Sequence, residues 1–94
     1  MAKKVKTRGE TYRELMQNAG RSWSECAVLS FVFESEYKAH LFHFELMETN
    51  LTYWLFDTFN GVANVIVPAD SKANERGIGE VAMKVGGKQR NAML

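Results

Sequence analysis

The sequence predicts an α+β domain, in which one N-terminal helix packs on an antiparallel sheet of four to five strands. A helix-start signal precedes an apolar helical stripe, apolar and polar residues alternate mid-chain, and an Asn-Gly pair separates two apolar runs. At 94 residues the chain suits one hydrophobic core. We therefore expect a single globular domain over 9–86, a disordered basic arm over 1–8 and a flexible basic tail over 87–94.

The helix is predicted over residues 9–18. Thr7 stands three residues before Glu10, which is the spacing of a capping box. Four apolar residues then follow on one helix face: Tyr12, Leu15, Met16 and Ala19. Gly20 stands where a left-handed residue would end the helix.

Two strands are predicted next, over 27–35 and 38–48. In the first, every odd position from Ala27 to Phe33 is apolar. In the second, Phe42, Phe44 and Leu46 alternate with the more polar His43 and Glu45. Residues 34–37 would form the turn between them, although they include neither Gly nor Asn.

A β-hairpin is predicted from residues 53–59 and 62–67. Asn60-Gly61 suits a type I′ turn, because both central residues of that turn need a positive φ. This turn would pair Phe59 with Val62, Asp57 with Asn64 and Leu55 with Ile66. Pro68 would end the second strand, 69–77 would be an exposed loop, and 79–85 would form a short last strand.

An all-helical fold is the alternative, with helices near 9–19, 23–34 and 36–60. Ser22 and Glu25 form a second capping box. Seven apolar residues also fall at a spacing of three and four: Tyr37, Leu41, Phe44, Met47, Leu51, Leu55 and Phe59. The Asn-Gly turn and the aromatic content favour the sheet.

The charges predict a protein partner. Residues 23–60 carry one Lys against five Glu and one Asp, whereas both ends of the chain are basic. An acidic surface beside exposed aromatic side chains is typical of a surface that binds a basic partner. The predicted interface residues are Glu34, Glu36, Tyr37, Glu45, Glu48, Tyr53 and Trp54. We expect a small non-enzymatic protein-binding module, a regulator or inhibitor that occludes its partner, and a homodimer.

Nucleic-acid binding is the alternative function. It would use basic residues from both ends of the chain, provided that the two ends meet in the fold. These residues are Lys3, Lys4, Lys6, Arg8, Lys84, Lys88 and Arg90. RNA or DNA is the expected ligand in that case.

No catalytic, cofactor or metal site is predicted. The sequence has no nucleophile elbow or phosphate-binding loop, so we expect no enzyme activity and no cofactor. On a strand, His40 and His43 would point to opposite faces and hold no metal; on a helix, Glu36 would join them. Cys26 is the single cysteine, which favours a buried structural thiol and a reducing compartment such as the cytoplasm. No apolar run reaches the length of a membrane helix.

Overall fold

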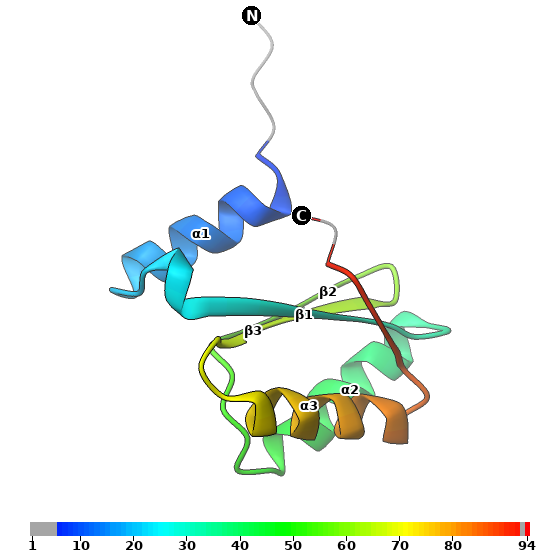
Figure 1. Ribbon diagram of the computed structural model, residues 1–94. Coiled ribbons are helices and arrows are strands. Elements are labelled where there is room, and N and C mark those ends of the chain that lie inside the picture. Colours follow the sequence, from blue (N-terminus) through cyan, green and yellow to red (C-terminus); the bar gives the residue numbers. More distant parts are fainter. Residues whose placement is uncertain (1–5, 93) are drawn as a thin grey trace, which may run out of the picture.

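The computed structural model describes residues 6–92 and 94 (Figure 1). The chain begins with helix α1 (Arg8–Asn18), a short 3-10 helix (Trp23–Glu25) and strand β1 (Cys26–Val32). Helix α2 (Glu36–Met47), strand β2 (Leu55–Phe59) and strand β3 (Val62–Pro68) follow. Helix α3 (Lys72–Lys84) and strand β4 (Lys88–Arg90) complete the fold. None of the helices in the described ranges is long and apolar enough to cross a membrane.

The four strands form one antiparallel sheet in the order β2-β3-β1-β4. Helices α2 and α3 cover one face of the sheet, and α1 lies over the other (Figure 1). From β1 onward, this is the β-α-β-β-α-β arrangement of the split-βαβ, or ferredoxin-like, fold. The predicted α+β class is confirmed, and the antiparallel sheet has four strands where four to five were predicted.

Two hydrophobic cores hold the layers together. The larger core lies between the sheet and the helix pair, with the Phe42 ring 5.2–5.4 Å from the rings of Phe31, Phe33 and Phe56. The smaller core joins Tyr12 and Met16 of α1 to Ile66 of β3. Alternation along the strands separates these two sets of side chains, because successive residues face opposite sides of a sheet.

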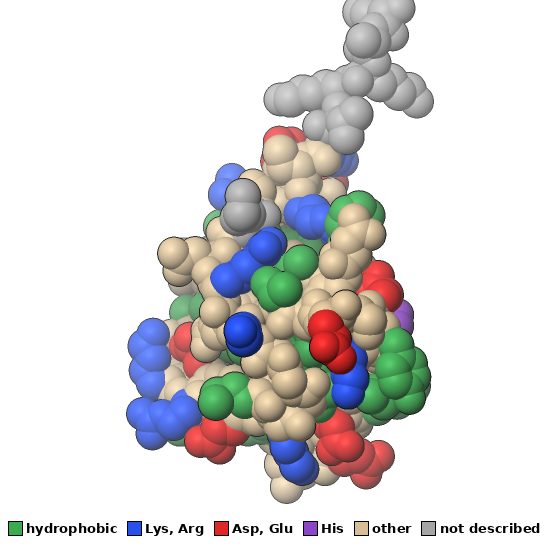
Figure 2. Space-filling view, turned by 90° about the vertical axis from the view of Figure 1, so that its right-hand side faces the viewer, with side chains coloured by type: hydrophobic (Ala, Val, Ile, Leu, Met, Phe, Trp, Pro, Cys, Tyr) green, Lys and Arg blue, Asp and Glu red, His purple; other side chains and the backbone are tan. Residues whose placement is uncertain are grey.

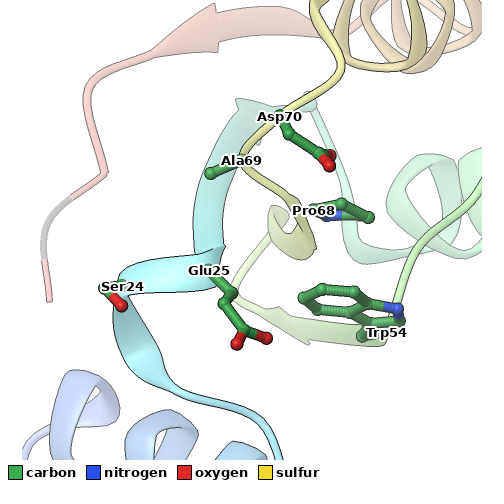
Figure 3. Close-up of a pocket in the computed structure, with 6 residues that line it drawn as sticks. All are labelled: Ser24, Glu25, Trp54, Pro68, Ala69 and Asp70. Carbon is green, nitrogen blue, oxygen red and sulfur yellow. The ribbon is translucent and has the colours of Figure 1, made fainter.

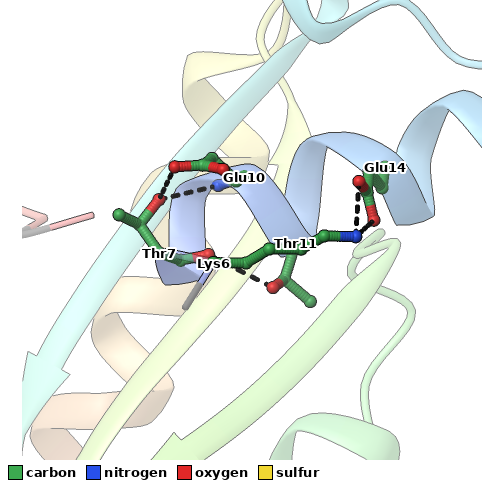
Figure 4. A network of polar contacts seen from close by, with 5 residues as sticks. All are labelled: Lys6, Thr7, Glu10, Thr11 and Glu14. Atoms are coloured by element: carbon green, nitrogen blue, oxygen red, sulfur yellow. Dashed lines mark hydrogen bonds and ion pairs between the residues drawn. The ribbon is translucent and has the colours of Figure 1, made fainter. Parts of the chain in front are cut away.

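Local signals predicted α1 well. The Thr7 hydroxyl accepts a hydrogen bond from the Glu10 N–H at 3.1 Å, and Lys6 pairs with Glu14 at 2.7 Å (Figure 4). Gly20 has a φ of 80°, and the next N–H, that of Arg21, bonds back into the last turn of the helix at 2.8 Å. The predicted cap, helix and terminating glycine are thus confirmed.

The predicted hairpin is confirmed together with its register. Asn60 and Gly61 have φ values of 51° and 78°, as a type I′ turn requires. Phe59 pairs with Val62, Asp57 with Asn64 and Leu55 with Ile66. β1 also forms where a strand was expected, although it runs from Cys26 to Val32 rather than over 27–35.

The predicted strand over 38–48 is wrong, because this segment is helix α2. Ser35 caps the helix by accepting the Lys38 N–H at 3.2 Å. Ala39, Phe42 and Leu46 are buried against the sheet, at the three-and-four spacing of one helix face. Phe44, which strand alternation would place beside Phe42 and Leu46, is instead exposed. The all-helical alternative placed a helix here, but its helix over 23–34 is wrong because that segment holds β1.

The chain after Pro68 also differs from the prediction. The expected loop over 69–77 and strand over 79–85 are wrong, because Lys72–Lys84 forms α3. Ser71 caps this helix by accepting the Asn74 N–H at 3.2 Å, and Ile78 and Ala82 are fully buried. Lys88–Arg90, expected in the flexible tail, forms β4 against β1.

Candidate protein-binding surface

Helix α2 has apolar residues on both faces, but the sheet covers only one of them. The outer face exposes Tyr37, Phe44 and Met47, with relative accessibilities of 68%, 62% and 50%, and half-buried Leu41 lies between them. Large apolar side chains on the outer face of a surface helix are unusual, because that face normally carries polar residues. We call this set, Tyr37, Leu41, Phe44 and Met47, the outer α2 surface.

Carboxylates border the outer α2 surface at both ends. Four glutamates of the loop before α2, of the helix and of its C-terminal cap are exposed: Glu34, Glu36, Glu45 and Glu48. Glu36 also accepts the Gly61 N–H at 3.2 Å, and Glu45 lies 3.9 Å from the ammonium of Lys84. Figure 2 shows one side of the molecule, where hydrophobic side chains reach the surface between acidic and basic ones.

Tyr53 and Trp54 pack on opposite faces of the sheet. The Tyr53 hydroxyl contacts His43 Nε2 at 3.2 Å, and the residue packs against the larger core. Trp54 packs against the smaller core on the other face of the sheet, with the Arg21 guanidinium 4.3 Å from its ring. The seven predicted interface residues therefore do not form one surface.

Leu41, Phe44 and Met47 are the residues of the outer α2 surface that the predicted interface did not include. The strand interpretation assigned Phe44 to an apolar strand face together with Phe42 and Leu46. The signal that identifies all three is their helical spacing from Tyr37. That spacing belonged to the all-helical alternative.

The C-terminal end of the chain meets the start of α1, where the described basic residues Lys6 and Arg8 are both paired with carboxylates. A Cβ atom on Gly9, in α1, would lie 3.0 Å from Leu94 Cβ, so the C-terminal residue touches the start of that helix. Lys6 pairs with Glu14 at 2.7 Å, and Arg8 pairs with Asp57 at 2.6 Å. These ion pairs reduce the positive charge available for a phosphate backbone.

The remaining basic residues do not gather in one place. Lys88 and Arg90 stand on β4 opposite Val32 and Ser30, close to the chain ends. Lys84 instead faces Glu45 of α2. Lys3 and Lys4 lie outside the described residues. The basic set predicted for nucleic acid is therefore divided between two parts of the molecule.

The histidines of α2 do not form a metal site with the nearby acids. Within residues 6–92 and 94, no three His, Cys, Asp or Glu side chains gather in a way that would hold a metal ion. His43 stacks flat on Phe56, with 4.0 Å between ring centres and 4° between planes. Burial, with a smaller effect from His40, lowers the pKa of His43 below its ordinary value.

Cys26 is half-buried, and its surroundings favour the protonated thiol. Its thiol lies 3.5 Å from the Ser22 carbonyl oxygen. Burial and the nearby Glu25 carboxylate raise the pKa of this thiol, whereas a reactive cysteine needs a lowered one.

Comparisons of the chain with protein-family models, curated proteins and solved structures found no match. A ferredoxin-like topology does not by itself specify an activity, since many unrelated functions use the same fold. The functional proposal therefore depends on the surfaces described above.

Proposed function

We propose that this protein is a non-enzymatic protein-binding module whose outer α2 surface docks on a partner with an apolar groove rimmed by Lys and Arg. The observation that carries the proposal is the exposure of large apolar side chains along a helix whose inner face is fully packed. A contiguous exposed apolar patch on a small domain often marks an interaction site.

The size of this surface suits the centre of an interface. A fully buried aromatic residue removes about 150–250 Å² from water. The exposed parts of Tyr37 and Phe44, together with Met47 and Leu41, therefore offer about 400 Å² of apolar area. A standard interface buries about 800 Å² on each partner, so polar residues around the surface would supply the remainder.

The charge around the surface favours a basic partner over a second copy of the chain. Four glutamates border it, against Lys38 within α2 and Lys84 from α3. Two copies docked through α2 would bring carboxylates of the same sign together, which costs binding energy. Binding through this surface needs no chemistry, so the module would regulate or inhibit its partner by covering it.

A site-specific photo-crosslinker tests the proposal in cells that naturally produce the protein. Placed at Phe44, it should capture a partner whose contact surface is basic, whereas at exposed Thr11 of α1 it should not. Binding of the purified partner should weaken at least tenfold in Glu45→Lys/Glu48→Lys. The matched control, Glu10→Lys/Glu14→Lys, makes the same change in net charge on α1 and should bind almost normally.

Three results would contradict the proposal: no crosslink at Phe44, crosslinking only to a second copy, or an equal loss of binding in the control variant. The nucleic-acid alternative has its own signature. It predicts salt-sensitive oligonucleotide binding that survives Phe44→Ser and is lost in Lys88→Ala/Arg90→Ala.

A further inference from the structure

A pocket of about 430 Å³ opens at the end of the sheet where β1 begins and β3 ends. Its walls come from three separate parts of the chain: Ser24, Glu25, Trp54, Pro68, Ala69 and Asp70. Figure 3 shows the Trp54 indole below Pro68, with Glu25 to one side and Asp70 above. This volume is at the small end of the range for ligand sites, which suits one side chain or a ligand of similar size.

Backbone hydrogen bonds connect these walls. The Trp54 N–H donates to the Ile66 carbonyl at 2.7 Å, which fixes the residue before β2 against β3. The Ala69 N–H donates to the Glu25 carbonyl at 2.9 Å, which fixes the β3–α3 connection against the start of β1. The pocket is therefore preformed, and a ligand would not have to order its walls.

The lining combines an aromatic ring, two apolar residues and two carboxylates. Glu25 and Asp70 are both exposed, and neither lies within 4.0 Å of a Lys, Arg or His nitrogen in the part of the chain that the structure describes. Pro68 and Ala69 supply apolar surface beside them. The two carboxylates would repel an anion. A cation with an aliphatic stem suits the pocket, because its charge would face the carboxylates and its stem would contact the apolar surface.

Trp54 already accepts a cation on its ring. The Arg21 guanidinium lies 4.3 Å from the ring centre, within the range of a cation–π contact, but Arg21 does not line the pocket.

We propose that this pocket binds the side chain of a lysine presented by a peptide or protein. The ammonium would lie between Glu25 and Asp70, and the methylene stem would pack on Trp54, Pro68 and Ala69. The proposal is independent of the outer α2 surface, because none of its residues belongs to that surface.

A nuclear magnetic resonance titration of the full chain tests this site. The probe is Nα-acetyl-lysine methylamide, and the neutral comparison is the same molecule acetylated on its side-chain nitrogen. The charged probe should saturate the shift of the Trp54 indole N–H with a Kd of about 1–10 mM, as expected for a single side chain. The neutral molecule should bind at least tenfold more weakly, and the Trp23 signal should move less than that of Trp54.

Isosteric variants separate a specific site from general attraction. Glu25→Gln/Asp70→Asn keeps the shape of the pocket, removes both charges and should weaken binding of the charged probe at least tenfold. Glu10→Gln/Glu14→Gln removes two charges elsewhere and should change the affinity less than twofold. The proposal is overturned by equal binding of charged and neutral probes, by an unsaturable shift, or by an equal loss in both double variants.

Discussion

The buried hydroxyl of Tyr12 links α1 to the sheet through hydrogen bonds. Tyr12 is only 2% exposed, and its hydroxyl donates to Asp57 Oδ2 at 2.6 Å while accepting from Asn64 Nδ2 at 3.1 Å. Asn64 is buried and accepts in turn from the Ser30 hydroxyl. Burial and the Asp57 carboxylate raise the pKa of the Tyr12 phenol, so it remains a protonated donor at neutral pH.

Tyr12→Phe removes this hydroxyl without changing the ring. A hydrogen bond to a charged group contributes about 1.5–3 kcal/mol, and a buried donor left without a partner costs about 1–3 kcal/mol. Arg8 still pairs with Asp57 at 2.6 Å, so that carboxylate keeps one partner. We therefore expect a loss of about 2–4 kcal/mol in the free energy of unfolding.

Urea unfolding at pH 7, followed by circular dichroism, measures this loss. Tyr37→Phe is the matched control, because its hydroxyl belongs to a side chain that is 68% exposed and should contribute less than about 0.5 kcal/mol. The transition should keep its slope, since the amount of surface exposed on unfolding is unchanged. A loss below about 1 kcal/mol, or equal losses in both variants, would refute the role assigned to this network.

Three further predictions concern α2, α3 and the hairpin. Burial lowers the pKa of His43 in the folded protein below its unfolded value of about 6.5. The protein therefore keeps its full stability above about pH 6.5 and loses stability as the pH falls from there through the folded-state pKa, because the unfolded state binds the proton more readily. Urea midpoints at pH 7.5 and 5 should show this loss, and an undiminished loss in His43→Gln would exclude this residue as its source. Gly61→Ala should lose about 1–3 kcal/mol, because φ is 78° and the new Cβ would lie 3.0 Å from the Phe33 carbonyl oxygen. Gly79→Ala should instead gain about 0.5–1 kcal/mol, since α3 leaves room for the methyl group; equal effects in a melting assay would contradict the assigned backbone geometry. Phe42→Ala should lose about 3–5 kcal/mol and Phe44→Ala less than about 1 kcal/mol, and a large loss at Phe44 in the same assay would show that its ring is buried.

The sequence by itself determined those features that depend on neighbouring residues. Thr7 and Gly20 mark the ends of α1, because a cap or a positive φ acts within a single turn of chain. Asn60-Gly61 fixed the hairpin and its register, since a two-residue turn leaves only one way to pair the strands.

The tertiary structure decided between helix and strand in segments whose apolar residues fit both periodicities. Phe42, Phe44 and Leu46 alternate as in a strand, yet Ala39, Phe42 and Leu46 also share a helix face, and packing against the sheet selects the helix. In α3, Gly77 and Gly79 are sequence signals against a helix, because glycine disfavours this structure. Gly77 nevertheless lies within the helix, where its missing side chain leaves space for Leu51. A Cβ atom at this position would lie only 2.7 Å from Leu51 Cδ2. That approach between distant residues leaves no local signal.

The candidate sites divide in the same way. The acidic and aromatic character of the middle of the chain was evident from its residues, and it led to Tyr37 and the bordering glutamates. The exposure of Phe44 depends on the tertiary structure, because α2 packs Phe42 and Leu46 on the sheet and leaves Phe44 on its outer face. The pocket joins Glu25, Trp54 and Asp70, which come from three segments that the sheet brings together. Local sequence sets caps, turns and alternation, because these act within a few residues, whereas helix choice, burial and pocket formation depend on contacts between distant parts of the chain.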